Sequence, residues 1–182
     1  MISPSPRQHH TLKKPALAAL LAALALAPSA QAASRTAPAS VTIFRPLNIS
    51  TTAQLSFGKL QYNGNGPATS NVVLSSAPPI TRTSADVQLL PGGSETPAIR
   101  TIAGEPSRIY RVTVPTSMVI PGLTVVSFTV WSTNSGNITA THLGQLNASG
   151  ADTVRIGATL VVPKGTKTAT YAVNPTITIS YE

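Results

Sequence analysis

The sequence predicts an all-β protein, built as a sandwich or a barrel. Short runs rich in Val, Ile, Thr and aromatic residues alternate with clusters of Pro, Gly, Asn and Ser, which is the pattern of strands separated by turns. Beyond the first 32 residues, no segment keeps the 3.6-residue apolar period of an amphipathic helix. The 182-residue chain has no cysteine, so a disulfide framework and a thiolate metal site are both excluded.

Each expected strand is a run of apolar residues that ends at turn-forming residues. Residues 154–162 alternate most clearly, with Val, Ile, Ala and Leu on one face. Residues 125–131 are mostly apolar, which predicts a central strand covered on both faces. Turns rich in Gly and Pro, such as 63–67 and 91–93, separate neighbouring runs. In chain order, the expected strands are residues 41–47, 55–57, 72–74, 87–90, 99–103, 109–114, 125–131, 138–143, 154–162 and 171–181.

Residues 1–32 have the three parts of a secretory signal peptide. A basic start at residues 7–14 precedes an unbroken Ala/Leu run at residues 16–27. The small-residue pattern Ala30-Gln31-Ala32 follows and predicts cleavage after Ala32. We therefore expect an exported bacterial protein, first in the periplasm and then at the cell surface or outside the cell. The apolar run is too short for a stable membrane span, so we expect no transmembrane segment after cleavage.

The remaining residues, 33–182, are expected to form a single domain. No repeat, low-complexity tract or long linker divides them, and a chain of about 150 residues is long enough to bury a real core. Cleavage removes three of the 13 basic residues and leaves 10 against five acidic residues, so the net charge falls from +8 to +5. Because the basic residues are spread singly along the chain, we expect no nucleic-acid partner.

Few residues of the expected domain suggest catalysis. His142 is its one histidine, and Ser149 and Asp152 lie close to it in sequence. Three such residues can form a nucleophile, base and acid, but no nucleophile-elbow motif surrounds Ser149. The acidic residues lie in or beside turns, and no histidine spacing typical of a zinc site is present. We therefore expect no enzyme, no cofactor and no metal.

Two aromatic residues leave a binding function open. Trp131 follows an apolar run, and we expect it to cap the core, with stacking on a sugar as the alternative. Tyr110 lies between Arg108 and Arg111, which we expect to face solvent. The alternative function is therefore a monomeric secreted β-sandwich that binds a carbohydrate or acts as an adhesin, with its site around Trp131 or Tyr110.

Both ends of the expected domain have the alternation of a strand. At one end Ala37, Ala39, Val41 and Ile43 alternate with Pro, Ser and Thr, and at the other residues 176–182 alternate throughout. Two strands able to pair would allow assembly by strand addition, in which an extension of one chain completes the sheet of the next. Such head-to-tail pairing does not close, so it produces filaments. From these residues alone, the expectation is that both end strands pair within the monomer, and strand addition is the alternative.

Several segments resemble those of bacterial pilin-like secreted domains. The first is Leu55-Ser56-Phe57-Gly58-Lys59-Leu60, and the second is Gly104-Glu105-Pro106 followed by residues 109–115. Residues 156–160 and a last strand from Tyr171 to Tyr181 complete the match, which covers nearly all of the expected domain. In their order and spacing these segments resemble spore-coat-U-like domains, archaic chaperone–usher pilins and an uncharacterised family of exported bacterial domains.

This resemblance implies an immunoglobulin-like β-sandwich that lacks one strand. A periplasmic chaperone would fill the gap, and the N-terminal strand of a neighbouring subunit would then replace it. The donor segment would lie within residues 37–44, with Val41 and Ile43 as the inserted side chains. The implied function is that of a non-enzymatic structural subunit of a fimbria-like or coat-like surface assembly. The acceptor strand that would face the chaperone is 171–181, with inward-facing Val173, Ile177, Ile179 and Tyr181.

Overall fold

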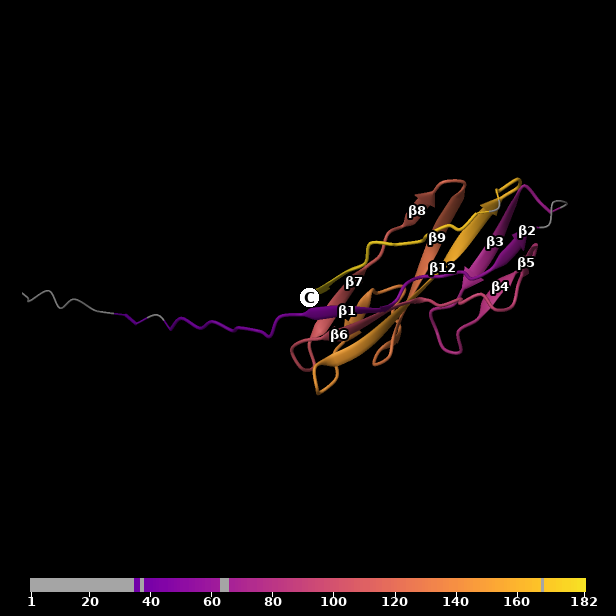
Figure 1. The fold of residues 1–182 in the computed structure, drawn as a ribbon. Coiled ribbons are helices and arrows are strands. Elements are labelled where there is room, and N and C mark those ends of the chain that lie inside the picture. Colours follow the sequence, from indigo (N-terminus) through magenta and orange to yellow (C-terminus); the bar gives the residue numbers. More distant parts are fainter. Residues whose placement is uncertain (1–34, 37, 63–65, 168) are drawn as a thin grey trace, which may run out of the picture. The chain divides into compact units, whose positions relative to one another are not determined.

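The computed structural model describes residues 35–36, 38–62, 66–167 and 169–182 (Figure 1). The expected signal peptide and its cleavage site lie outside these residues. The chain divides into two units, residues 1–42 and residues 43–182. In the first unit, the described residues have no regular secondary structure and are exposed. The described part of the chain has no helix that is long and apolar enough to cross a membrane.

The second unit is all-β, as the sequence predicts, and its largest sheet is built around one long strand, β12 (Ala151–Pro163). One edge of β12 pairs with β6 (Ala98–Ala103) along its first half and with β3 (Thr69–Leu74) along its second half. The other edge pairs with β9 (Leu123–Ser132). All of these pairings are antiparallel. The sheet is extended by β1 (Asn48–Ala53) beside β6, β4 (Arg82–Ser84) beside β3, and β8 (Ser117–Ile120) and β10 (Gly136–Asn137) beside β9.

A smaller antiparallel sheet faces the large one across the core. Its strands are, in order, β11 (Leu143–Gln145), β7 (Ile109–Thr113) and β13 (Thr178–Tyr181). Tyr110 of β7 crosses the core and donates its hydroxyl hydrogen to Oδ2 of Asp152 on β12 at 2.5 Å. The two sheets therefore form a β-sandwich. A separate pair, β2 (Leu60–Tyr62) and β5 (Val87–Leu89), lies between β1 and β6 in the sequence.

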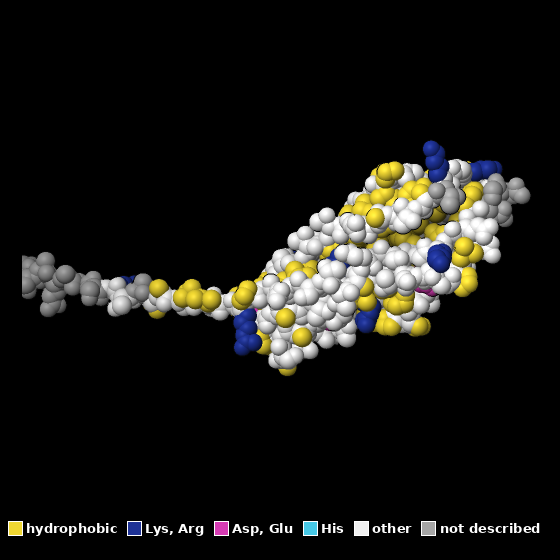
Figure 2. Space-filling view, viewed as in Figure 1, with side chains coloured by type: hydrophobic (Ala, Val, Ile, Leu, Met, Phe, Trp, Pro, Cys, Tyr) yellow, Lys and Arg dark blue, Asp and Glu magenta, His cyan; other side chains and the backbone are white. Residues whose placement is uncertain are grey.

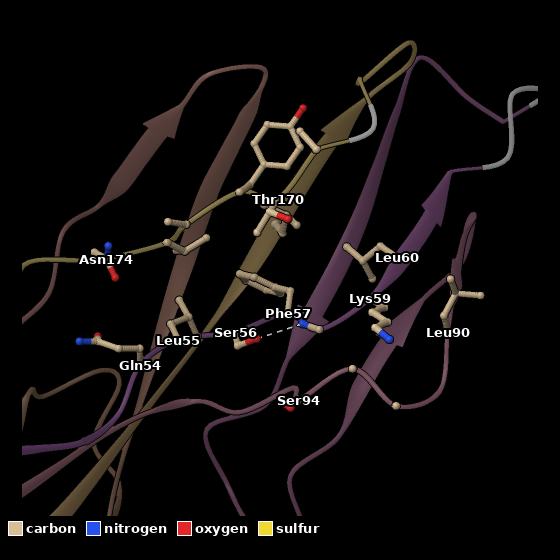
Figure 3. A pocket seen from close by; sticks show the side chains of 18 residues that line it. Gln54, Leu55, Ser56, Phe57, Lys59, Leu60, Leu90, Ser94, Thr170 and Asn174 are labelled. Atoms are coloured by element: carbon tan, nitrogen blue, oxygen red, sulfur yellow. Dashed lines mark hydrogen bonds between the residues drawn. The ribbon is translucent and has the colours of Figure 1, made fainter.

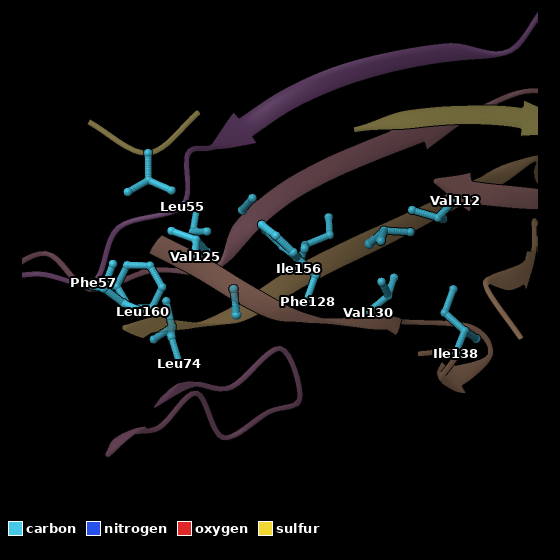
Figure 4. Close-up of a cluster of buried hydrophobic side chains, with 14 of the residues drawn as sticks. Leu55, Phe57, Leu74, Val112, Val125, Phe128, Val130, Ile138, Ile156 and Leu160 are labelled. Carbon is cyan, nitrogen blue, oxygen red and sulfur yellow. The ribbon is translucent and has the colours of Figure 1, made fainter. Parts of the chain in front are cut away.

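Alternating side chains fill the space between the sheets (Figure 4). The inward residues of β12 are Val, Ile, Ala and Leu at every second position from 154 to 162, as the sequence predicts, and all are buried. Full burial of one such large apolar side chain contributes about 1.5–3 kcal/mol. The members of the core that Figure 4 labels are Leu55, Phe57, Leu74, Val112, Val125, Phe128, Val130, Ile138, Ile156 and Leu160.

A β-bulge in β9 explains why the sequence of this strand does not alternate. Ser127 has a φ of 51°, and the pairing of β9 with β12 shifts register beside it. Val125 before the bulge and Phe128 after it are therefore both buried. The prediction that residues 125–131 are covered on both faces is wrong, because the outward side chains of this strand remain partly exposed.

The expected strands differ most from the structure at the two ends of the sandwich. Residues 41–47 form no strand, and the first strand is the more polar β1. Residues 55–57 contribute a single bridge, from Ser56 to Thr96. Of the expected last strand, 171–181, only β13 pairs with a neighbour. Of residues 138–143, only the last joins a strand. The segments 55–57 and 171–177 therefore have backbone N–H and C=O groups that are not paired within the described residues.

Candidate strand-binding groove

A hollow of about 720 Å³ opens the sandwich between residues 54–60 and residues 169–174. Figure 3 shows the two segments on opposite sides of it, with Gln54 to Leu60 along one side and Thr170 and Asn174 on the other. We call this hollow the groove and the two segments its first and second walls. Its apolar lining includes four buried residues of the core, namely Leu55, Phe57, Leu160 and Val173.

The first wall uses one edge of its backbone at Ser56, and the opposite edge is unused at Leu55. Ser56 donates its N–H to the carbonyl of Thr96 at 2.8 Å and accepts the N–H of Thr96 at 2.9 Å. Successive residues of an extended chain direct their backbone groups to opposite sides. The N–H and C=O of Leu55 therefore point away from Thr96, and no backbone hydrogen bond joins them to another described residue. This edge can accept an additional strand.

Arg82 on β4 holds the first wall in place. Its guanidinium donates to the carbonyl oxygens of Phe57 at 2.7 Å, Lys59 at 3.2 Å and Leu90 at 3.1 Å. The side chain is 7% exposed, and its Nη2 lies 3.8 Å from the carboxylate of Glu95. Hydrogen bonds from a charged donor are stronger than those between neutral groups. Arg82 thus connects two loops, at residues 57–59 and at Leu90. We call these contacts the support of the first wall.

Two glycines allow the loops to approach each other at this support. Gly58 has a φ of 69°, a conformation that residues with a Cβ rarely adopt. A Cβ at Gly93 would collide with the backbone nitrogen of Lys59. The sequence of the first wall therefore fixes its shape through backbone packing as well as through Arg82.

The second wall carries fewer restraints. Residues 170–177 belong to no strand and make no backbone hydrogen bond within the described part of the chain. Val173 is 8% exposed and anchors this wall in the core. Tyr171 packs against the core, and its hydroxyl donates to the carbonyl of Lys167 at 2.8 Å. Both walls of the groove are thus extended backbone with unused pairing groups.

Two further hollows, of about 460 and 700 Å³, adjoin the groove, and both share Ala169 and Tyr171 with it. Figure 2 shows hydrophobic side chains gathered in a band over β8, β9 and the chain that leads to β13. Val119 of β8 is 77% exposed. Exposed apolar side chains that gather in this way are typical of an interaction site.

The residues predicted for strand exchange lie in different surroundings. Val41 and Ile43 are 84% and 86% exposed, outside any strand. Val173 lines the groove. Ile179 is buried in β13, whereas Ile177 and Tyr181 are half-buried against the core. Of the four predicted acceptor residues, Val173 is therefore the one that lines the groove.

Tyr181 holds the residues that lead into β1. Its hydroxyl accepts the backbone N–H of Glu105 at 2.6 Å and donates to the carbonyl of Arg45 at 2.9 Å. The Glu105 carboxylate accepts the backbone N–H of Arg45 at 3.1 Å. The guanidinium of Arg108 lies 3.9 Å from the ring centre of Phe44, a cation–π contact. Phe44 and Arg45 are therefore fixed to their own domain.

The structure gives Asp152 a role in linking strands. Its carboxylate accepts hydrogen bonds from the hydroxyls of Tyr110 and Ser132 and from the backbone N–H groups of Asn134 and Thr153. Burial, and then the hydrogen bond to Asp152, raise the pKa of Tyr110 above its usual value. These bonds join β7, β9 and β12.

Ser149 and His142, which lie close to Asp152 in sequence, make other contacts. The Ser149 hydroxyl donates to Oδ1 of Asn147 at 2.7 Å, and His142 follows the turn at residues 139–141 with a φ of 58°. No hydrogen bond joins Ser149 or His142 to Asp152 among the described residues. In the same part of the chain, no group of three or more His, Asp or Glu side chains could hold a metal ion.

Sequence reasoning did not identify the first wall or its support. The available signal for the first wall was the alternation of Leu55 and Phe57 before Gly58. Residues 55–60 otherwise stand out in the sequence by their resemblance to a segment of pilin-like domains. Arg82 gives no comparable signal, because it lies between two threonines and its carbonyl partners are far away in sequence.

A family model described as a domain of unknown function, DUF4402, matches residues 47–181. This range contains both walls of the groove and Arg82. No curated protein and no solved structure matches the chain.

Proposed function

The chain belongs to the DUF4402 family, and from its groove we propose that it is a non-enzymatic structural subunit that assembles by strand addition. The groove carries this proposal, since it combines an apolar floor with two extended walls that have unused backbone groups. An added strand that pairs with these walls would complete an immunoglobulin-like sandwich lacking one strand. The assembly would be a fimbria-like or coat-like structure on a bacterial surface, formed after export.

The occupant we propose is the N-terminal segment of another copy. Val41 and Ile43 are large apolar side chains with most of their surface exposed, and they alternate with polar residues as an inserted strand requires. Because Phe44 contacts Arg108 in its own domain, the donated part ends at Ile43. In extended form, residues 35–43 span about 30 Å and the first wall, 54–60, about 23 Å, so the donor is long enough.

The energetics require backbone pairing as well as side-chain burial. Burying Val41 and Ile43 contributes about 1.5–3 kcal/mol each. Association costs about 4–15 kcal/mol in lost freedom, so these two side chains offset only the lower part of that range. Each ladder hydrogen bond adds about 0.5–1.5 kcal/mol. The unused backbone groups of Leu55 and of residues 170–174 supply the acceptors and donors for that ladder.

Before assembly, an open groove is an aggregation hazard because apolar surface and unpaired backbone lie together. A periplasmic chaperone that lends a strand would cover the groove until a neighbouring subunit replaces it. The pairing is head to tail and does not close on itself, so successive additions build a filament.

Substitution of the donor side chains tests the proposal. The full chain with Val41→Asp and Ile43→Asp is expressed for export, and unheated and boiled samples are compared on a denaturing gel. The unsubstituted chain is expected to give a ladder that collapses on boiling, and the double variant a monomer band. Ile80→Asp, at a loop side chain that is 37% exposed and does not line the groove, is the matched control and should keep the ladder.

Two outcomes would overturn the proposal. One is a ladder that persists in the double variant, or after deletion of residues 33–44. The other is an unsubstituted chain that is a cooperatively folded monomer at every concentration. In that case the N-terminal segment fills the groove of its own chain, or the sandwich needs no added strand.

A further inference from the structure

Trp131 lies on the outer face of the large sheet. Its neighbours in β9, Val130 and Ser132, are fully buried, so the indole between them points away from the core. Trp131 remains partly exposed and is not a member of the core cluster. The sequence prediction that it caps the core is therefore wrong. The chain has one tryptophan, the side chain with the largest apolar area to bury, and the fold leaves it at the surface.

Strand register places two polar side chains beside the indole. Trp131 is directly opposite Arg155 of β12 and Asn137 of β10. Side chains that oppose each other in this way lie about 4.5–5.5 Å apart at Cβ. Gly136 leaves the space near the indole open, since a Cβ there would lie 3.9 Å from Cη2. A guanidinium, an aromatic ring and a carboxamide thus form one row across three neighbouring strands.

A second row of hydroxyl groups runs beside the first. Thr153 of β12 pairs with Thr101 of β6, and the backbone N–H of Thr133, in the turn after β9, donates to the carbonyl of Thr153 at 2.9 Å. The Arg155 guanidinium donates to Oγ1 of Thr133 at 3.3 Å. A hydrogen bond of 3.0 Å joins the hydroxyls of Thr52 on β1 and Thr101. Hydroxyls from three strands and from the turn after β9 therefore border the aromatic row.

The charge of this face is positive. Arg155 contributes a guanidinium, and the described carboxylates are engaged or placed elsewhere. Asp152 faces the core, and Asp86 lies in the bend between β4 and β5. The remaining acids contact basic residues or their backbone in other parts of the fold, namely Glu95 with Arg82, Glu105 with Arg45 and Glu182 with Arg111. A ligand with negative charge is favoured at such a face.

We propose that the outer face around Trp131 and Arg155 binds a polysaccharide that contains uronic acid units. The apolar C–H face of a sugar ring would stack on the indole, and its carboxylate would pair with the planar guanidinium fork. Sugar hydroxyls would exchange hydrogen bonds with Asn137 and the neighbouring threonines. This site shares no residue with the groove, so it stands or falls independently of strand addition.

Tryptophan fluorescence tests this proposal directly, because the chain has one tryptophan. The purified full-length protein is titrated with a galacturonate hexamer, with maltohexaose as the neutral sugar and polyglutamate as the anionic non-sugar. The galacturonate hexamer is expected to give a saturable change in emission. Maltohexaose should bind about fivefold more weakly, the effect of losing one exposed ion pair of about 1 kcal/mol. Polyglutamate should give no saturable change.

Variants separate stacking from charge. Migration in a gel that contains polygalacturonate reports binding without fluorescence, and Trp131→Ala should weaken retention about tenfold. Arg155→Gln should weaken it about fivefold. Lys164→Gln removes the same charge from the turn after β12 and should leave retention unchanged. Each variant is first compared with the unsubstituted protein by thermal unfolding.

Three results would overturn the proposal. The first is that the galacturonate hexamer gives no saturable change in fluorescence. The second is an equal response to polyglutamate, which would show attraction by charge alone. The third is retention that survives Trp131→Ala in a variant whose unfolding temperature is unchanged.

Discussion

Replacing Arg82 with glutamine is predicted to loosen the first wall of the groove. The side chain is 7% exposed and donates to three backbone carbonyls, of Phe57, Lys59 and Leu90. Lys59 O also accepts the N–H of Leu90, so the carbonyl of Phe57 depends on Arg82 most. A hydrogen bond to a charged group contributes about 1.5–3 kcal/mol, and an orphaned buried acceptor costs about 1–3 kcal/mol. Glutamine replaces one of the bonds, so the expected loss is about 2–4 kcal/mol.

Denaturant unfolding measures this loss, and amide hydrogen exchange locates it. The free energy of unfolding should fall by the stated amount in Arg82→Gln, and the amide of Ser56 should exchange faster. Arg82→Lys keeps the charge near Glu95 but lacks the planar fork, so it should recover only part of the loss. Arg111→Gln removes an arginine whose ion pair with Glu182 is exposed and should change stability little. A loss below about 1 kcal/mol in Arg82→Gln, or unchanged exchange at Ser56, would refute the assigned role.

Three further predictions concern the sandwich itself. Asp152→Ala removes an acceptor of four hydrogen bonds and should cost about 3–5 kcal/mol in thermal or denaturant unfolding; a loss under 1 kcal/mol would contradict the linking role. The raised pKa of Tyr110 means that its contribution to stability is complete below about pH 10, the unfolded value, and is lost above it. Unfolding measured from pH 7 to 11 should show this decline, and Tyr110→Phe should reduce it. Gly157→Ala would bring a Cβ against the carbonyl oxygen of Leu74 and should destabilise more than Gly92→Ala, where φ is 69° but the space is open; equal losses would contradict the crowding.

The strands in the middle of the sandwich follow from their sequence because each buries one face. Residues 154–162 alternate over nine positions, and β12 has that alternation in the structure. The bulge at Ser127 breaks the period of β9, so its sequence indicated burial on both faces and placed Trp131 in the core. The polar strand β1 has no apolar period to detect. Pairing with β6, a non-local contact, creates that strand.

The groove was less predictable than the fold. An alternating segment such as 171–177 has the same sequence whether it pairs or remains unpaired, because its partner is decided by the rest of the sheet. Arg82 binds backbone carbonyl groups 8 to 25 positions away in the sequence. Every residue has such a carbonyl, so residue types do not identify these partners. The sequence therefore predicted residues 171–181 as a segment able to pair with an added strand, whereas the first wall, the unused backbone groups and the contacts of Arg82 required the structure.

Disulfide trapping between copies tests strand addition most directly. The chain has no cysteine, so every disulfide would come from an introduced pair. Copies with Val41→Cys are produced together with differently sized copies that carry Gln54→Cys or Thr170→Cys, one on each wall of the groove. The account predicts a mixed disulfide between unlike copies under mild oxidation, and none when Ile80→Cys replaces the groove cysteine. The absence of a mixed disulfide at both walls, or an equally abundant one with Ile80→Cys, would contradict strand addition.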